Sequence, residues 1–190
     1  MDFNGLLPSL EAGRCDTLIS GAYITPEREQ KFDAVGYLQT NVVLIGKPDA
    51  EVLSTSDAIA GKTIAVQSGT DFVARLEALQ KELAGKGLAE IRIQQYPKQT
   101  DALQQLLVGR ADLVVTQDTE VAYREIQSPG QFKILYTFPE SEIYTAFFAK
   151  NPQDKAAFAA AVKSLKGAGT LLELLKKWKL PEDRISSIGN

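Results

Sequence analysis

The sequence predicts an α/β fold, and two observations support this. Short apolar runs typical of buried strands alternate with amphipathic segments of helical length. A unit of helix, glycine, arginine and strand also occurs twice, at residues 7–20 and again at residues 103–116. Because an alternation of strand and helix is typical of sheets with helices packed on their faces, we expect a chain built from two related α/β lobes.

Both copies of the repeat read Leu-x-x-Leu-x-x-Gly-Arg-x-Asp before an apolar run. The leucines have helical spacing, the glycine suits a helix C-cap, and the apolar run predicts a short buried strand. Each strand ends in a small hydroxyl residue, Ser20 in the first copy and Thr116 in the second. Ligands of open α/β sheets bind just beyond the carboxyl ends of strands, so two such ends facing one another would form a cleft.

The remaining elements follow in chain order. The predicted strands are residues 62–67, 91–96, 112–116 and 132–138. The predicted helices are residues 70–84, 100–108, 119–127, 154–166 and 170–178. Extended apolar segments at 40–46 and 143–149 indicate two crossovers between lobes. The first lobe is therefore expected at 1–42 plus 144–190, and the second, a complete α/β domain, at 43–143.

Composition excludes several classes of function. A net charge of −3 and a pI near 5.1 leave no basic surface for nucleic acid. The chain has no histidine, which removes Ser-His-Asp and Cys-His catalysis and most zinc sites, so neither a catalytic residue, a metal nor a cofactor is predicted. No apolar run is long enough to cross a membrane, and no basic-then-apolar signal region follows Met1.

The first copy of the repeat lacks a segment that the second copy has. A strand, a helix and a strand at 62–96 precede the helix of the second copy, whereas only residues 1–5 precede the helix of the first. The first lobe is therefore predicted to be incomplete. We expect its strand at 16–20 to lie in a parallel sheet with an unpaired edge, which favours a homo-oligomer in which a neighbour covers that edge.

Several segments together resemble a known family. Residues 2–16, Ile19-Ser20-Gly21 and 24–28 resemble the polar amino-acid solute-binding proteins of bacterial ABC importers, which are type II periplasmic binding proteins of family 3. Residues 53–70 and 109–116 do so as well, and the similarity covers essentially the whole chain. The resemblance implies a periplasmic-binding-protein-like clamshell of two α/β lobes joined by two crossovers, with the first lobe incomplete.

The resemblance also implies a location and partners. Such proteins are periplasmic and bind a small-molecule ligand, an amino acid or a related carboxylate, which they deliver to the membrane subunits of an ABC importer. The absence of a signal region predicts a cytoplasmic location if Met1 is the true start.

Candidate ligand-binding residues in the first lobe follow the strand at 16–20. Thr25-Pro26 is a helix start, with Thr25 as the N-cap. It leaves Arg28 near the strand end, where its planar guanidinium suits a carboxylate. The resemblance assigns Arg28 to the ligand α-carboxylate, as an alternative to a surface ion pair. It also assigns Ser20, Gly21 and Tyr23 to the ligand head group, although Tyr23 is large enough to be a wall.

Candidate residues in the second lobe lie at two strand ends. Ser68, Gly69 and Thr70 join a strand to a helix N-terminus, which favours an anion, and Thr70 can also cap that helix. The resemblance implies that this turn binds the same carboxylate. At the other strand end, the family has an aspartate for the ligand ammonium where this chain has Gln117, followed by Asp118. Asp118 is either the shifted partner or an N-cap, or the ligand is not a standard α-amino acid.

Three functions stay open from the sequence. The first is a non-enzymatic binding protein for a small carboxylated solute, most simply a polar amino acid, of or derived from an ABC uptake system. The second is a lyase of the cyclohexadienyl dehydratase type on the same scaffold, which needs a general acid or base in its cleft. The third is a truncated descendant that binds no ligand and is stable only as an oligomer.

Overall fold

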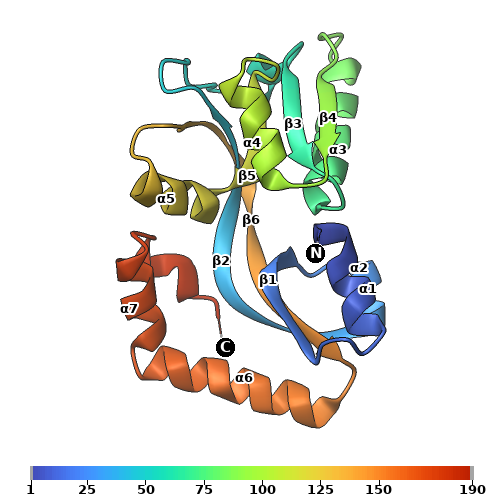
Figure 1. Cartoon of the computed structure of the whole chain (residues 1–190), viewed down its shortest axis with the longest axis vertical. Helices are drawn as coiled ribbons and strands as arrows, with labels where there is room; N and C mark the ends of the chain where they lie inside the picture. The colour runs from blue at the N-terminus through green and yellow to red at the C-terminus, as the bar shows by residue number, and fades with distance from the viewer. Residues whose placement is uncertain (1, 189–190) are drawn as a thin grey trace. The chain divides into compact units, whose positions relative to one another are not determined.

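The computed structural model describes residues 2–188, which divide into two compact units (Figure 1). Unit 1 contains Gly5–Thr40 and the segment that begins at Ser141. Unit 2 contains Asn41–Glu140 together with the short segment Asp2–Asn4. The predicted α/β fold is confirmed, because strands and helices alternate along the chain and one mixed sheet has the strand order β1-β6-β2-β5-β3-β4.

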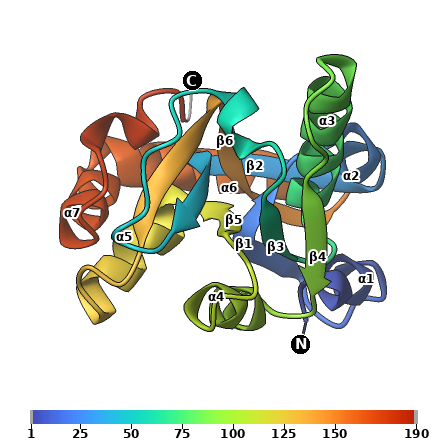
Figure 2. The same ribbon diagram turned by 90° about the horizontal axis from the view of Figure 1, so that it is seen from above.

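Unit 2 has a parallel arrangement at its centre. Its strands are β3 (Thr63–Gln67), β4 (Arg92–Tyr96) and β5 (Leu113–Gln117), and its helices are α3 (Asp71–Gly85), α4 (Gln99–Leu107) and α5 (Asp118–Gln127), with a short 3-10 helix η2 (Ser56–Ile59). β3 lies between β4 and β5 and runs parallel to both. Figure 2 shows α3 and α4 on opposite sides of β3 and β4. Parallel strands covered on both faces are apolar throughout, as the fully buried Ile64-Ala65-Val66 is.

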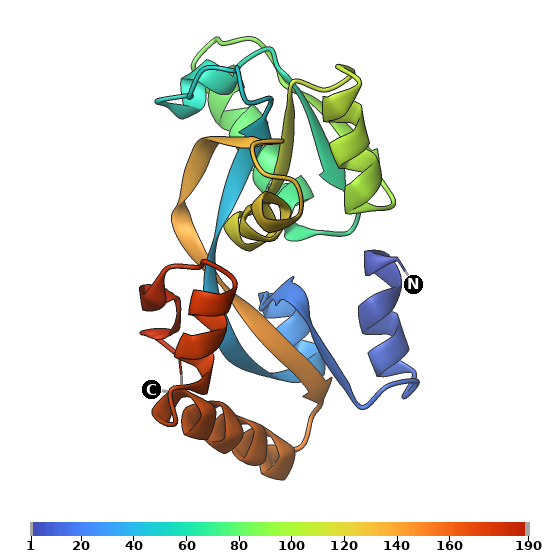
Figure 3. The same ribbon diagram turned by 60° about the vertical axis from the view of Figure 1, so that its left-hand side comes forward.

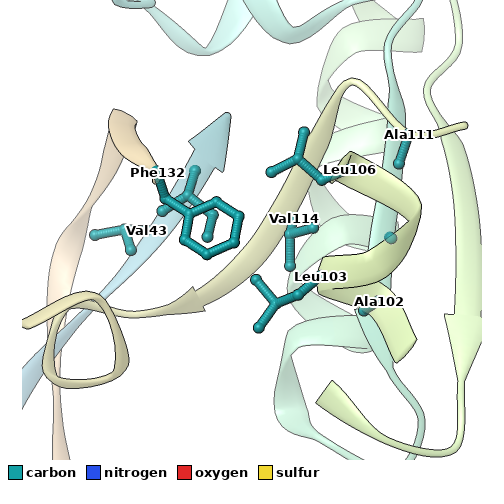
Figure 4. Close-up of a cluster of buried hydrophobic side chains, with 9 residues drawn as sticks. Val43, Ala102, Leu103, Leu106, Ala111, Val114 and Phe132 are labelled. Carbon is teal, nitrogen blue, oxygen red and sulfur yellow. The ribbon is translucent and has the colours of Figure 1, made fainter. Parts of the chain in front are cut away.

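One buried cluster joins α4 to the sheet of unit 2. Leu103 and Leu106 of α4 pack with Val114 of β5, and Val43 and Phe132 complete the layer (Figure 4). The helical spacing of the leucines places them on one face of α4, which explains why this face is buried. Burial of each such side chain contributes roughly 1.5–3 kcal/mol to the stability of unit 2.

Unit 1 contains the first copy of the repeat and the C-terminal helices. Its N-terminal elements are α1 (Leu6–Glu11), β1 (Thr17–Tyr23) and α2 (Pro26–Lys31), and a 3-10 turn η1 (Phe3–Gly5) precedes α1. The C-terminal elements are α6 (Pro152–Gly167), α7 (Thr170–Lys177) and η3 (Glu182–Ile185). Figure 3 shows α6 and α7 as consecutive helices, and they contact each other. Gly169, in the left-handed conformation, interrupts the helical backbone between them.

Two long strands belong to both units. β2 (Phe32–Gly46) and β6 (Lys133–Ala149) each cross the boundary between the units without interruption. The sequence predicted crossovers at 40–46 and 143–149 and a separate strand at 132–138. The structure merges that strand and the second crossover into β6, even though Pro139 and the two exposed residues after it, 140 and 141, weaken the apolar pattern there.

The predicted parallel environment of the strand at 16–20 is wrong. β1 pairs antiparallel with β6, Thr17 opposite Phe148 and Ile19 opposite Ala146, and it stands at the end of the strand order. Antiparallel pairing explains how β1 is held without further parallel neighbours, since one pairing partner with a buried inner face is enough for an edge strand. Its other edge has no strand partner within residues 2–188.

The two copies of the repeat make equivalent backbone hydrogen bonds. The amide of Gly13 donates to Leu10 in unit 1, as Gly109 donates to Leu106 in unit 2. Arg14 donates to Ser9 in the same way as Arg110 donates to Gln105. Both glycines have positive φ, 65° and 74°, which explains why glycine ends each helix. The predicted helix-to-strand unit is therefore confirmed in both copies.

Candidate functional site

The predicted ligand-binding residues fall into two groups, one in each unit. The strand-end group of unit 1 contains Ser20, Gly21, Tyr23 and Arg28, and the turn group of unit 2 contains Ser68, Gly69, Thr70, Gln117 and Asp118. Each group lies at the carboxyl end of a strand, β1 in unit 1 and β3 or β5 in unit 2. The structure thus assigns each group of predicted residues to one unit.

Arg28 is held in place by the helix start that precedes it. The hydroxyl of Thr25 accepts a hydrogen bond from the Arg28 amide at 3.3 Å, so Thr25 is the N-cap of α2 as predicted. The half-buried Arg28 side chain turns back and donates from Nη1 to the Tyr23 carbonyl. This bond fixes the guanidinium at the end of β1. The planar shape of a guanidinium suits it to pair with a carboxylate.

The acidic neighbour of Arg28, Glu27, has a lowered pKa. The pKa of Glu27 is lowered by a hydrogen bond from its own backbone amide and by one involving Thr25. Desolvation opposes these two effects, and the positive charge of Arg28 lowers the pKa by a smaller amount. Glu27 is in the first turn of α2, where a negative charge is favoured by the helix dipole.

Tyr23 is a packing residue in the free chain. Its side chain is 4% exposed, and its ring stacks on Tyr144 with centroids 5.8 Å apart. A Cβ on Gly21 would approach the same Tyr144 ring at 3.3 Å, so glycine at 21 leaves room for this ring. Tyr37 contacts Tyr144 as well and donates from its hydroxyl to the Ser20 carbonyl at 2.8 Å. These contacts favour the interpretation of Tyr23 as a residue that forms a wall of the site rather than a hydrogen-bond partner of the ligand.

Sequence reasoning missed Tyr37 and Tyr144 in this group. Both come from the long strands β2 and β6, far along the chain from β1. Tyr144 is brought to Tyr23 by strand pairing, in which the two residues are directly opposite each other. Local periodicity carries no signal for such a pair, because only the register of β1 against β6 decides it.

The turn of unit 2 is tied to β4. The Ser68 amide donates to the Tyr96 carbonyl at 2.8 Å, and the Ser68 hydroxyl donates to the same carbonyl at 3.1 Å. The Thr70 hydroxyl donates back to the Gln67 carbonyl at 2.7 Å. Thr70 occupies the N-cap position of α3 but does not cap this helix with its side chain, which corrects one of the two predicted roles. The helix dipole of the 15-residue α3 is thus directed at the turn without a capping oxygen.

Gly69 is required at the centre of this turn for two reasons. Its φ is +76°, a conformation that side chains other than glycine adopt at a cost. A Cβ at this position would also overlap the carboxamide of Asn4, which is part of unit 2. The Asn4 side-chain oxygen therefore lies directly against the turn, a contact that the sequence did not predict.

The end of β5 departs from one prediction. Asp118 was expected as a possible N-cap, but the N-cap position is Gln117, and Asp118 is the first residue of α5. Gln117 makes no side-chain capping bond. Helix α5 begins one residue earlier than expected because a carboxylate is favourable in the first turn as well as at the cap. Thr116, the hydroxyl residue that ends the predicted strand, is fully buried and lies opposite Val43 of β2.

Residues 2–188 contain neither a cluster of metal ligands nor a helix that could span a membrane. No three histidine, cysteine, aspartate or glutamate side chains are grouped closely enough to hold a metal ion. No helix in this range combines the length and apolar character that crossing a membrane requires.

Comparison with known proteins places this fold and these motifs in one family. The family model of bacterial extracellular solute-binding proteins, family 3, matches residues 1–181. The chain therefore belongs to this family, and the predicted type II periplasmic-binding-protein fold, with two lobes joined by two crossovers, is confirmed.

Individual relatives are similar along almost the whole chain. The arginine-binding extracellular protein ArtP of Bacillus subtilis is 28% identical over 94% of this chain and 68% of its own length. The arginine-binding protein ArgT of Corynebacterium glutamicum is 28% identical over 95% of this chain and 60% of its own length. A solved ancestral arginine-binding protein bound to arginine is 25% identical with a TM-score of 0.79, over 94% of this chain and 77% of that one. The chain thus spans about two thirds of the length of these curated relatives.

Proposed function

We propose that the chain is a solute-binding protein whose ligand is a small molecule with a carboxylate, most simply a polar amino acid. One observation carries the proposal: each unit presents an anion-binding arrangement at the carboxyl end of a strand. In unit 1 this is the Arg28 guanidinium fixed by the Tyr23 carbonyl, and in unit 2 it is the uncapped start of α3 at the turn 68–70. The arginine-binding relatives support an amino acid as the ligand.

The site supports binding rather than catalysis. A guanidinium and a helix N-terminus stabilise a carboxylate without proton transfer, whereas a lyase needs a positioned acid or base. Glu27, the acid next to Arg28, is exposed, and its pKa is lowered, which favours the ionised form over a proton donor. The function proposed is therefore non-enzymatic.

The ammonium of an amino-acid ligand has one candidate partner. Gln117 carries an amide and cannot supply a counter-charge, so Asp118 at the first turn of α5 is proposed for this role. As partners of the loaded protein we propose the membrane subunits of an ABC importer, and as its location the outside of the cytoplasmic membrane, in keeping with the extracellular family.

Isothermal titration calorimetry with arginine, glutamine and cystine tests the proposal. Each amino acid is paired with its decarboxylated analogue, agmatine in the case of arginine. A ligand held by its carboxylate binds in the first form and not in the second. Failure of every amino acid to bind would contradict the proposal.

The Arg28→Lys variant identifies the carboxylate group in the same experiment. Lysine keeps the charge but loses the planar fork, and a charged hydrogen bond of this kind contributes roughly 1.5–3 kcal/mol, so affinity is expected to fall about tenfold or more. Arg14→Lys is the matched control, because Arg14 is an exposed arginine of unit 1 that follows α1. Equal affinity of the Arg28→Lys variant and the unmodified chain would show that Arg28 does not bind the ligand carboxylate.

The Asp118→Asn variant tests the ammonium partner. Asparagine removes the charge and keeps the size of the side chain, so affinity for amino acids is expected to fall while affinity for carboxylates without an ammonium stays the same. An unchanged affinity for amino acids would show that Asp118 contributes to helix α5 and not to ligand binding.

A further inference from the structure

A groove of about 640 Å³ in unit 2 contains none of the predicted ligand-binding residues. It lies between α3 and the first part of β6, and every residue that lines it is within Asn41–Glu140. The side chains that the argument needs are Ser56, Arg75, Leu79, Glu82, Tyr136 and Phe138. Binding sites for small molecules have volumes of roughly 300–1,000 Å³, so the size of the groove suits such a ligand.

Two aromatic rings of β6 contribute to the lining of the groove. Tyr136 and Phe138 are two positions apart and so project from the same face of the strand. Their ring centroids are 5.2 Å apart, and the ring planes are almost perpendicular. The Arg75 guanidinium lies over the Phe138 ring, 5.3 Å from its centroid. Phe138 is 6% exposed and Tyr136 is half-buried, so the Tyr136 ring is the more accessible of the two to a further cation.

The charged side chains that line the groove are mostly acidic. They are the carboxylates of Asp71, Glu82 and Glu140 and the guanidinium of Arg75. Glu140 Oε2 accepts a hydrogen bond from Arg75 Nη1 at 3.0 Å. Glu82 Oε1 accepts from Lys86 Nζ at 2.7 Å and from the Ser56 hydroxyl at 3.2 Å. Both glutamates therefore receive hydrogen bonds from the protein itself, while the lining as a whole keeps an excess of negative charge.

The phenol of Tyr136 responds to this negative charge. Burial raises the pKa of Tyr136, and the charges of Glu82 and Glu140 raise it further. Lys86, which also pairs with Asp57, lowers this pKa by a smaller amount. The carboxylates thus act on the position of the Tyr136 side chain, where a positive charge is favoured.

We propose that this groove binds a small quaternary ammonium compound, whose head group lies on the Tyr136 ring. A quaternary ammonium gains from the face of an aromatic ring and from nearby negative charge. It has no N–H group, so it does not have to compete with Arg75, Lys86 and Ser56 for the carboxylate oxygens. Its apolar part contacts Leu79 of α3. The proposal does not depend on the carboxylated ligand proposed above.

The same chemistry disfavours other classes of ligand. An anion would be repelled by the excess of carboxylates, and a neutral molecule would gain nothing from them. A primary ammonium is compact and strongly hydrated, so it loses more on leaving water than a quaternary ammonium does. The methylated cation is therefore the form that an aromatic, acidic groove selects.

An NMR titration of the full chain with choline tests the site. The amide and methyl signals of Ala78 and Leu79 are the readout, because both residues line the groove. The neutral control is 3,3-dimethyl-1-butanol, which has carbon in place of the choline nitrogen, and the primary-amine control is ethanolamine. Choline should give saturable shifts at both residues, and each control should bind about tenfold more weakly or less. Sodium chloride at the same ionic strength corrects for screening.

Variants assign the binding to the ring and to the carboxylate. Tyr136→Leu should weaken choline binding about fivefold or more, whereas Tyr136→Phe, which keeps the ring, should retain it. Tyr123→Leu, at an exposed tyrosine of α5, is the matched control. Glu82→Gln should also weaken binding, whereas Glu77→Gln, at an exposed glutamate of the same helix α3, should not.

Four outcomes would overturn the proposal. The first is the absence of shifts at Ala78 and Leu79 beyond those that sodium chloride produces. The second is equal affinity for choline and for either control compound. The third is choline binding that Tyr136→Leu and Glu82→Gln both leave intact. The fourth is a set of saturable shifts confined to the turn 68–70 and the start of α5, which would place the cation at the other site of unit 2.

Discussion

The segment α1–β1 in unit 1 and the segment α4–β5 in unit 2 have the same leucines, the same left-handed glycine and the same hydrogen bonds at the helix end. They differ in their neighbours. α4 contacts β3, β4 and β5, whereas α1 contacts β1. The comparison teaches that the helix-to-strand unit forms from local signals, and that its burial depends on a third element, the parallel strand that unit 2 supplies.

The largest expected difference between the copies is at the equivalent leucines. Leu103→Ala should destabilise the chain by about 2–5 kcal/mol, because Leu103 is 3% exposed and its removal leaves a cavity beneath α4. Leu7→Ala should lower the free energy of unfolding by clearly less, since Leu7 is half-buried and water can fill the space that its side chain leaves. Urea unfolding of both variants measures the difference. Equal costs would mean that α1 is packed as completely as α4.

The second-largest difference in stability cost is expected between the equivalent aspartates. Asp112→Ala leaves the amide of the buried Thr63 without its acceptor and should cost about 1–3 kcal/mol. Asp16→Ala should change stability little, because Asp16 is exposed at the free edge of β1. The same urea titrations measure both. A large cost for Asp16→Ala would show that its carboxylate already has a structural role in the free chain.

The glycines at the two helix ends, in contrast, should respond alike to substitution. Gly13→Ala and Gly109→Ala should each cost about 1–2 kcal/mol, because both residues have positive φ and neither has a steric obstacle to a Cβ. The two costs should be alike, in contrast to the leucine pair. Thermal unfolding followed by circular dichroism compares them. Markedly unequal costs would show that the local structure also depends on the neighbouring strand.

The smallest expected effect concerns the end of β1, where Tyr37 donates to the Ser20 carbonyl. Burial raises the pKa of Tyr37 from 10.0 to about 12, so the folded chain keeps a proton that the unfolded chain loses in this range. The stabilising contribution is therefore complete below pH 10 and declines as the pH rises towards 12.

Urea unfolding between these pH values measures that decline. Tyr37→Phe should make it shallower, whereas Tyr123→Phe, at an exposed tyrosine of α5, should not. An identical decline in the Tyr37→Phe variant and the unmodified chain would assign the effect to other groups.

The local structure around several candidate residues could be predicted from the sequence, because its signals are local. Thr25 before Pro26 marks the start of α2 and so places Arg28, and the confirmed cap fixes this arginine at the end of β1. Ser68-Gly69-Thr70 is a turn between an apolar strand and a helix. This turn requires a residue with positive φ at its centre, which is why glycine stands at position 69. Less could be said of the hydroxyl of Thr70 or the position of Asp118, because a helix start can satisfy its amides in several ways that differ by one residue.

The sequence by itself determined the two copies of the helix-to-strand unit, their glycine ends and the order of the elements, since these depend on residues within a few positions of one another. The tertiary structure alone decided that β1 pairs antiparallel with β6, that Tyr144 lies opposite Tyr23 and that β2 and β6 run unbroken through both units. The physical reason is that strand pairing joins backbone groups more than a hundred residues apart, and the pattern of either strand alone does not specify its partner or its direction.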